Sequence, residues 1–312
     1  MERVGIGCAK LLLFGEHSAL YGYPSVGLGL PESTEIRVSE DSSRRWRFPD
    51  LAANEAERLD GLLERAAGAL PGLRGGGGDI RITSTIAPAL GFGSSAALCV
   101  ALARAFAPAG TGARELWSIA HRAEGFFHGR PSGIDTGLSL HGGLISFAPS
   151  RPLPRHRPLR GPRACLVVGA LPRRESTAAL VGGLAARMAS GDGGARALIE
   201  ELGSIAERAI ALIDRGGSDR PVSLSRLGEL LGAAHRALGG LGLGDRGVDR
   251  LISFGLDHGA YGGKQSGAGS GGAFFLLYPT EAAAMASLSS ISALAQAEGL
   301  AFASPLRIVN LH

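Results

Sequence analysis

Apolar residues near the start of the chain fall in short runs rich in leucine and β-branched residues, a pattern typical of strands. Four such runs are predicted to be strands, at residues 4–8, 10–14, 25–30 and 35–38. Residues 79–86 alternate polar and apolar positions and predict a fifth strand. The N-terminal part of the chain is therefore expected to build a sheet.

Elsewhere apolar positions recur every three or four residues, which predicts amphipathic helices. One lies within 51–70, where Leu59, Leu62 and Ala66 share a face. Further helices are expected at 94–106, 114–128, 176–190, 194–215, 221–239, 246–258 and 280–298, and further strands at 164–169, 273–278 and 307–309. This mixture predicts an α+β protein.

The proline-rich segment 148–163 is expected to separate two lobes. A chain of 312 residues exceeds the roughly 250 to 300 residues at which single hydrophobic cores stop growing. We therefore expect domains at 1–160 and 161–312. Apolar residues make up 45% of the chain and charged residues 19%, as in a globular protein.

The charge pattern argues against a nucleic-acid partner. The net charge is +4, and the one dense basic run, 151–163, contains four prolines and no aromatic residue on which a base could stack. A solvated connector explains this run better than a nucleic-acid surface does. Lysine usage is more selective: of 32 basic residues only Lys10 and Lys264 are lysines, which suggests a need for a compact ammonium at both positions.

Cys8, Cys99 and Cys165 lie in apolar runs without paired spacing, so neither a disulfide framework nor a zinc site is indicated. The N-terminus lacks a basic segment followed by a long apolar core. No apolar stretch approaches the ~18 residues of a membrane span. We expect a soluble cytoplasmic protein without a membrane partner.

The most informative stretch is 88–106, where a predicted strand is followed by a glycine turn and an alanine-rich helix. Gly91, Gly93, Ser94, Ser95 and Ala96 form this turn and the helix start. Glycines let a backbone approach an anion, and the first N–H groups of a helix point at it. The stretch therefore predicts a phosphate-binding loop.

Three other interpretations compete with a phosphate-binding loop for this stretch. A dinucleotide fold fits the spacing of residues 91–96 but would need a second strand ending in an acidic residue about 20 positions on, which is missing. A Walker A loop is excluded, because Lys264 is followed by Gln265 instead of Ser or Thr. Ser94 could also simply cap the helix.

Several polar residues lie where a site could form. Glu16 and His17 follow a predicted strand, although a surface loop explains such a pair better when it is taken alone. Glu124 shares a helix face with His121 and His128, which suggests either a metal site or an exposed polar face. Asp135 is expected in a turn-rich loop after that helix, as a catalytic carboxylate, a helix cap or a residue bonding its own turn.

Four of these segments, taken in order, resemble the superfamily of galactokinase, homoserine kinase, mevalonate kinase and phosphomevalonate kinase, the GHMP kinases. The segments are 10–22, 91–97, 128–135 and 264–272. Within the superfamily, the sequence is most similar to the mevalonate kinases. The resemblance implies a two-lobed α+β fold with an N-terminal lobe like ribosomal protein S5 and a ferredoxin-like C-terminal lobe.

The resemblance also implies roles for individual residues. Asp135 would face the acceptor hydroxyl with Lys10 beside it, and Ser95 and Glu124 would bind Mg²⁺ on the phosphates of ATP. Glu16 and His17 would lie on the substrate side. The segment 173–177, with Thr177 and an arginine, would lie near the acceptor carboxylate, although Ser176 or Thr177 could equally be a helix cap. The implied cofactor-binding residues are Gly91, Gly93, Ser94, Ser95, Ala96, Lys264, Gly267 and Gly269.

The activity implied is phosphorylation of the primary hydroxyl of mevalonate by ATP and Mg²⁺, giving 5-phosphomevalonate. Two alternatives remain open at this stage. One is a related kinase acting on another small hydroxylated or phosphorylated acid, such as phosphomevalonate. The other is a non-catalytic sensor of nucleotide and ligand. The sequence does not decide the oligomeric state, for which a homodimer is one option.

Overall fold

The computed structural model describes residues 2–68, 70–73, 75–128, 131–216 and 222–311. Two compact units share the chain. Unit 1 comprises Met1–Lys10, Gly29–Ala87 and Gly93–Gly142, and unit 2 comprises Leu11–Leu28, Pro88–Phe92 and Gly143–His312. The chain thus passes between the units several times, and independent domains at 1–160 and 161–312 stay a prediction.

The first two strands are longer than the sequence pattern suggested. β1 covers Glu2–Phe14 and β2 covers Ser25–Glu40, so the four expected runs are parts of two continuous strands. Ala9, between the first two runs, is fully buried and continues β1 instead of breaking it. Both strands contribute residues to each unit.

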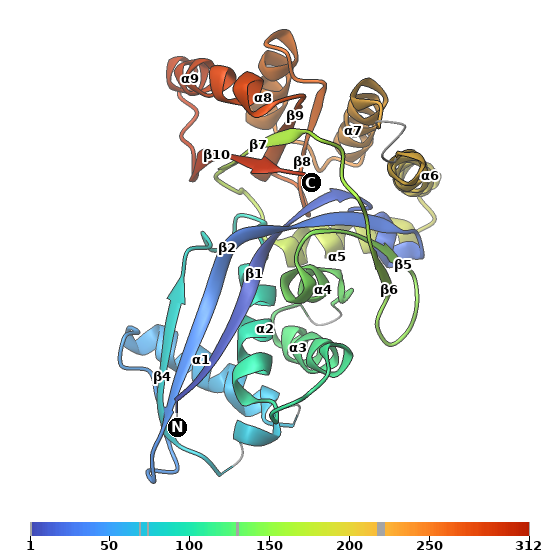
Figure 1. The fold of residues 1–312 in the computed structure, drawn as a ribbon. Coiled ribbons are helices and arrows are strands. Elements are labelled where there is room, and N and C mark those ends of the chain that lie inside the picture. The colour runs from blue at the N-terminus through green and yellow to red at the C-terminus, as the bar shows by residue number, and fades with distance from the viewer. Residues whose placement is uncertain (1, 69, 74, 129–130, 217–221, 312) are drawn as a thin grey trace. The chain divides into compact units, whose positions relative to one another are not determined.

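Unit 1 packs helices against these strands. The end of β2 pairs antiparallel with β4 (Gly78–Ser84), and β3 (Trp46–Arg47) pairs parallel with β4. The helices are α1 (Ala53–Ala66), α2 (Ser94–Phe106), α3 (Ala113–His128) and α4 (Ile134–His141), with a 3₁₀ turn at Pro71–Leu73. Figure 1 shows α2, α3 and α4 side by side.

Glycines in β1 allow α2 to approach closely. A Cβ added to Gly5 would lie 2.0 Å from the carbonyl oxygen of Ala101, and one on Gly7 would lie 2.1 Å from that of Ala97. Ala97 and Ala101 are themselves fully buried. The small residues on both elements therefore fix the start of α2 close to β1.

Unit 2 contains an antiparallel sheet in the order β10-β7-β9-β8 (Figure 1). Its strands are β7 (Cys165–Leu171), β8 (Gly262–Gln265), β9 (Gly272–Tyr278) and β10 (Ser304–Asn310). The helices are α5 (Thr177–Ala189), α6 (Gly193–Arg215), α7 (Leu224–Gly240), α8 (Arg246–Asp257) and α9 (Glu281–Ala297), with a 3₁₀ turn at Ser18–Tyr21. Leu251 of α8 and Ile291 of α9 join the core that covers β7 and β9.

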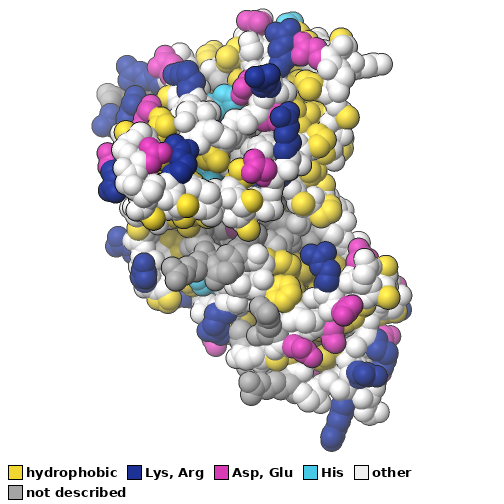
Figure 2. Space-filling view, turned by 180° about the vertical axis from the view of Figure 1, so that it is seen from behind, with side chains coloured by type: hydrophobic (Ala, Val, Ile, Leu, Met, Phe, Trp, Pro, Cys, Tyr) yellow, Lys and Arg dark blue, Asp and Glu magenta, His cyan; other side chains and the backbone are white. Residues whose placement is uncertain are grey.

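The proline-rich connector is more ordered than expected. The start of β2 pairs with β5 (Leu144–Ala148), which pairs with β6 (Arg155–Pro158) inside the connector. Arg157 of β6 donates two hydrogen bonds, of 2.9 and 2.7 Å, to Asp214 of α6. On the face shown in Figure 2, basic and acidic side chains are interspersed among the described residues.

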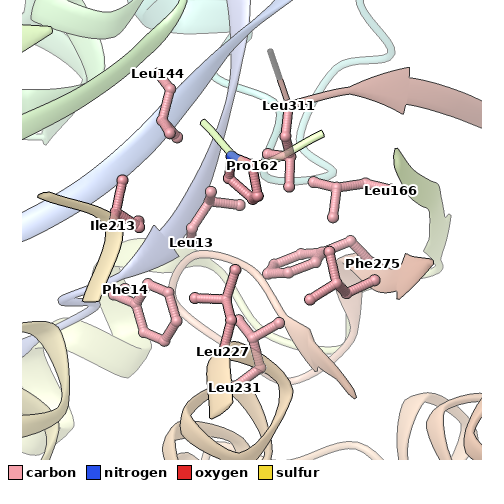
Figure 3. Close-up of a pocket in the computed structure, with 11 residues that line it drawn as sticks. Leu13, Phe14, Leu144, Pro162, Leu166, Ile213, Leu227, Leu231, Phe275 and Leu311 are labelled. Atoms are coloured by element: carbon pink, nitrogen blue, oxygen red, sulfur yellow. The ribbon is translucent and has the colours of Figure 1, made fainter. Parts of the chain in front are cut away.

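A small apolar cavity lies within unit 2 (Figure 3). Its volume is about 10 Å³, which is at the lower limit for one water molecule. Phe14, Leu227, Leu231 and Phe275 are among its lining residues. An apolar void of this size stays dry, so it is a packing defect rather than a ligand site. None of the helices in the described ranges has both the length and the apolar character to cross a membrane.

Candidate active site

The glycine turn before α2 has the backbone that an anion-binding loop requires. Ala89, Gly91 and Gly93 have φ of 61°, 95° and 77°, and Gly93 occupies the N-cap of α2 without a side-chain cap. The alternative in which Ser94 caps the helix is therefore wrong, because Ser94 is the first helical residue. The N–H groups of Ser94, Ser95 and Ala96 precede the first helical hydrogen bond, which is where a helix binds anions.

Lys10 lies directly over this turn. Its side chain is 5% exposed, and a Cβ on Gly93 would be 2.7 Å from Cγ and 2.9 Å from Cε of the lysine. Lys10 Nζ lies 3.0 Å from Asp135 Oδ2. Unit 1 thus brings the helix start of the predicted phosphate loop, residues 93–96, together with the lysine and the aspartate.

Replacing Gly93 tests this contact. We expect Gly93→Ala to lower kcat about 10²-fold, because the new methyl group displaces the Lys10 side chain. A displacement of a catalytic group by about 1 Å lowers the rate by about that factor. The left-handed backbone adds a destabilisation of about 1–2 kcal/mol. Gly110 has a similar φ of 82° with open space around it, so Gly110→Ala controls for the backbone alone. Equal kinetics of the two variants would contradict the contact.

Asp135 lies in the first turn of α4, not in the loop expected from the sequence. Two donors fix the start of this helix: Trp117 Nε1, 2.9 Å from the carbonyl oxygen of Gly133, and Thr136 Oγ1, 3.1 Å from the same oxygen. The loop interpretation was wrong. Because α4 has only eight residues and follows a glycine, its sequence lacks the apolar repeat that would have predicted a helix. Residues 129–130 of the same motif lie outside the described residues.

Glu124 of α3 is a buried carboxylate of unit 1. Its side chain is 2% exposed, and Oε2 has no hydrogen-bond partner among the described residues. Burial, reinforced by the charge of Asp135 and opposed by Lys10, raises the pKa of Glu124 to about 8. A carboxylate in this environment favours a cation as its missing partner. The exposed polar face considered for Glu124 is therefore wrong.

The metal site once considered with His121 and His128 is not supported. Within the described ranges, no group of three or more His, Cys, Asp or Glu side chains is arranged to hold a metal ion. Burial lowers the pKa of His121, and the side chain of His128 is outside the described part.

Glu16 and His17 of unit 2 are buried, at 2% and 7% exposure, so the surface-loop interpretation of this pair was wrong. Glu16 Oε1 forms an ion pair with Lys264 Nζ, which also donates to the carbonyl oxygen of Gln265 at 2.8 Å. His17 Nε2 donates to the carbonyl oxygen of Ala268 at 3.0 Å. The second lysine singled out by composition therefore contacts the predicted substrate-side pair.

The third glycine motif, 264–272, runs into β9 as the sequence indicated. Gly267 and Gly269 have φ of 86° and 102°, and a Cβ on Gly269 would lie 2.4 Å from the carbonyl oxygen of Leu243. Within unit 2, Ala273 N donates to Leu90 O at 2.7 Å. A Cβ on Gly91 would lie 3.4 Å from the carbonyl oxygen of Ser266. The motif thus packs against the first part of the glycine turn.

Arg173 and Thr177 form a further polar pair in unit 2. Arg173 Nη1 donates to Thr177 Oγ1 at 3.0 Å, and Arg173 Nε is buried without a partner among the described residues. Burial lowers the pKa of Arg173. Ser176 is the N-cap of α5, accepting from Ala179 N at 3.2 Å, so the cap alternative holds for Ser176 and not for Thr177.

Buried histidines make stability depend on pH. Burial lowers the pKa of His17, His121 and His235 in the folded chain. The unfolded chain, with values near 6.5, then binds more protons as the pH falls through 6.5. We expect the free energy of unfolding measured in urea to drop between pH 7 and pH 5, by up to about 1.4 kcal/mol per pH unit for each histidine. The raised pKa of Glu124 opposes part of this drop, because the folded chain binds a proton there that the unfolded chain does not. The slope should be shallower in His17→Gln, and a flat profile would contradict these shifts.

Comparisons with known proteins identify the family. A model of the GHMP kinases N terminal domain matches residues 56–143, and one of the GHMP kinases C terminal matches residues 222–293. The mevalonate kinase of Methanothermobacter thermautotrophicus is 30% identical over 282 residues, covering 87% of this chain and 88% of that protein. That of Pyrococcus horikoshii is 28% identical, with 87% of each chain covered.

Solved structures agree with this assignment. The crystal structure of L. major mevalonate kinase in complex with R-mevalonate has a TM-score of 0.75 and 25% identity, covering 95% of this chain and 91% of its own. Lactococcus lactis galactokinase complexed with galactose shares the fold, with a TM-score of 0.78 at 17% identity and coverage of 99% and 92%. The expected two-lobed α+β kinase fold is confirmed, and the chain belongs to the GHMP kinase family.

Proposed function

We propose that this kinase transfers the γ-phosphoryl group of ATP to the primary hydroxyl of mevalonate, giving 5-phosphomevalonate. The observation that carries the proposal is the Lys10–Asp135 pair of 3.0 Å beside the glycine turn at the start of α2. Its relatives over most of the chain are mevalonate kinases, and the L. major structure holds R-mevalonate.

Asp135 and Lys10 serve the attacking hydroxyl. Phosphoryl transfer needs alignment and charge stabilisation more than covalent chemistry from the protein. Asp135 accepts a hydrogen bond from the acceptor hydroxyl and so orients its oxygen. Lys10 stabilises the negative charge that grows on that oxygen. The N–H groups of Ser94, Ser95 and Ala96 bind phosphate oxygens at the helix start.

Mg²⁺ fits the residues that the sequence assigned to it. Ser95 and Glu124 would hold it, because hydroxyl and carboxylate oxygens are ligands that Mg²⁺ accepts and Glu124 Oε2 is a buried atom without a partner among the described residues. One or two protein ligands suffice, since phosphates and water complete the octahedron. When bound, Mg²⁺ supplies the positive charge that neutralises the phosphates.

Replacing Glu124 tests the metal assignment. We expect Glu124→Gln to raise the Mg²⁺ concentration for half-maximal nucleotide binding by at least about tenfold, the loss seen even for outer partners of metal ligands. Calorimetric titration of nucleotide at several Mg²⁺ concentrations measures this without turnover. Glu115→Gln, on the exposed first turn of the same helix, is the matched control. An unchanged Mg²⁺ dependence would show that Glu124 does not bind the metal.

The remaining residues proposed for the acceptor belong to unit 2. His17 binds mevalonate, with Nδ1, buried and without a partner among the described residues, as an acceptor. Glu16, which pairs with Lys264, supports His17. Arg173 is the natural partner for the mevalonate carboxylate, because guanidinium and carboxylate form two parallel hydrogen bonds. Thr177 supports Arg173 through their hydrogen bond.

The acceptor is tested by measuring ADP release with ATP and Mg²⁺ on mevalonate, phosphomevalonate, homoserine and galactose. The proposal predicts turnover on mevalonate alone. Turnover on a different acceptor would keep the kinase mechanism and replace the substrate. Nucleotide binding without turnover on any acceptor would favour a sensor.

A further inference from the structure

The backbone at His17 is strained. Its φ is 58° and its ψ is −47°, and Ser18 N donates to the carbonyl oxygen of Glu16 at 2.6 Å. A hydrogen bond from residue i+2 to residue i around such a centre is a γ-turn of positive φ, which is rare and strained. Such a conformation persists only where its surroundings determine it. Something in unit 2 must therefore hold this turn.

The third glycine motif supplies the contacts that hold it. Ser266 Oγ accepts from Leu12 N and donates to Leu12 O, both at 2.9 Å, and so fixes the strand that leads to the turn. The carbonyl oxygen of Ala268 accepts from His17 Nε2 at 3.0 Å. Lys264 Nζ pairs with Glu16. Three contacts from five consecutive residues thus fix the backbone and both side chains of the turn.

The ion pair in this set is fully withdrawn from water. The side chains of Lys264 and Glu16 are 0% and 1% exposed, and the ring of Phe275 lies 5.7 Å from Nζ. Two of the three ammonium donors are already used, by Glu16 and by the carbonyl oxygen of Gln265. Removing either partner leaves the other charge buried and uncompensated. The pair therefore dictates where Glu16 lies.

The motif itself has firm anchors. Gln265 Nε2 donates to the carbonyl oxygen of Leu243 at 2.9 Å, and Ser270 N donates to the same oxygen at 2.9 Å. Lys264 and Gln265 also belong to β8, which pairs with β9. Lys264 therefore acts from a paired strand, and the loop that carries Ser266 and Ala268 is anchored at both ends to Leu243. We call these contacts of Lys264, Ser266 and Ala268 the clamp on the His17 turn.

We propose that Lys264 is a positioning residue of the acceptor side: its ion pair with Glu16 holds the γ-turn that aims His17. This inference rests on the proposed function only for its kinetic test. It gives Lys264 a different role from the phosphate contact that the family resemblance implied, because its ammonium points to Glu16.

Steady-state kinetics with mevalonate and ATP varied separately tests the proposal. Lys264→Met is expected to raise the KM for mevalonate at least tenfold and to leave the KM for ATP within twofold. Glu16→Gln should do the same, and the double variant should be no worse than the poorer single variant, because both act through one contact. Arg157→Gln, which removes an exposed cation of unit 2, is the control.

Two kinetic outcomes would overturn the proposal. One is a raised KM for ATP with an unchanged KM for mevalonate in Lys264→Met, which would place Lys264 at the nucleotide. The other is multiplied losses in the double variant, which would make the two residues independent. Should Lys264→Met not fold, the double variant, which buries no lone charge, carries the same KM test.

A measurement without substrate tests the role of Lys264 independently of whether mevalonate is the acceptor. The ¹⁵N shifts of the His17 ring, assigned against His17→Gln, should report a proton fixed on Nε2 in the wild-type protein. In Lys264→Met or the double variant, the proton should be shared between both ring nitrogens. If the ring shifts change but the wild-type protein does not phosphorylate mevalonate, the positioning role of Lys264 is supported and mevalonate is rejected as the acceptor. Unchanged ring shifts in a folded variant would reject the clamp.

Discussion

Asp135→Asn is expected to lower kcat by about 10²- to 10⁴-fold, the contribution typical of a side chain that exchanges a proton or hydrogen bond with the reacting group. The amide keeps the shape of the carboxylate but offers the acceptor hydroxyl a weaker acceptor. It also removes the negative partner 3.0 Å from Lys10 Nζ. The KM for ATP should change little, since Asp135 serves the acceptor. Single-turnover and steady-state ADP release measure both effects.

The fold of this variant should survive. Asp135 is about one-third exposed, and the start of α4 is fixed by Trp117 and Thr136, not by the aspartate. Thermal unfolding and nucleotide binding of Asp135→Asn are therefore the controls. A folded, ATP-binding variant that retains kcat within tenfold of the wild type would remove Asp135 from the chemistry.

Lys10→Met is expected to lower kcat by about 10²- to 10³-fold, the loss typical of removing one donor that stabilises charge in a transition state. Methionine replaces the stem that covers Gly93 but carries no charge, so the loss reports the ammonium and not the packing. The effect should fall on kcat more than on the KM for mevalonate, because the charge develops during transfer.

Lys10→Arg is the informative companion. The lysine side chain is 5% exposed against Gly93, and a planar guanidinium needs more room than an ammonium. We expect Arg to restore little of the activity although it restores the charge. Arg37→Met, an exposed cation of unit 1, should leave kcat unchanged. Full activity of Lys10→Met would show that the ammonium does not assist transfer.

Much of the fold could be predicted because the chain marks its elements locally. The helices from α5 to α9 agree with the expected ranges within a few residues, since each has an apolar stripe and most begin at a Ser, Asp or Thr cap. The pairing of Lys10 with Asp135 was expected from the resemblance of ordered motifs. Composition alone had singled out both lysines.

The elements that the sequence did not show are those without a local pattern. β8 has the sequence Gly-Gly-Lys-Gln and is a strand only because β9 pairs with it. α4 is too short to display an apolar stripe, and β6 is an exposed strand inside the connector. The secondary structure of such segments is determined by tertiary contacts and not by the intrinsic propensity of their residues.

At the site, the missing information was which polar groups face each other. No local signal places Glu16 against Lys264, because 248 positions separate them. Trp117, whose indole donates to Gly133 at the start of α4, looked like one more apolar residue of an amphipathic helix. That Lys264 is one of only two lysines in the chain was the one sequence signal for the buried ion pair. The structure identifies Glu16 as its partner.

The ³¹P spectrum of the product made from ATP and mevalonate shows which hydroxyl receives the phosphoryl group. For transfer to the primary hydroxyl, we expect a phosphate monoester signal split into a triplet by the two protons of the adjoining CH₂ group, together with stoichiometric ADP. The signal should be absent with Asp135→Asn over the same time. A phosphate ester without that coupling, or ATP left unconsumed by the folded wild-type protein, would rule out phosphorylation of the primary hydroxyl by this chain.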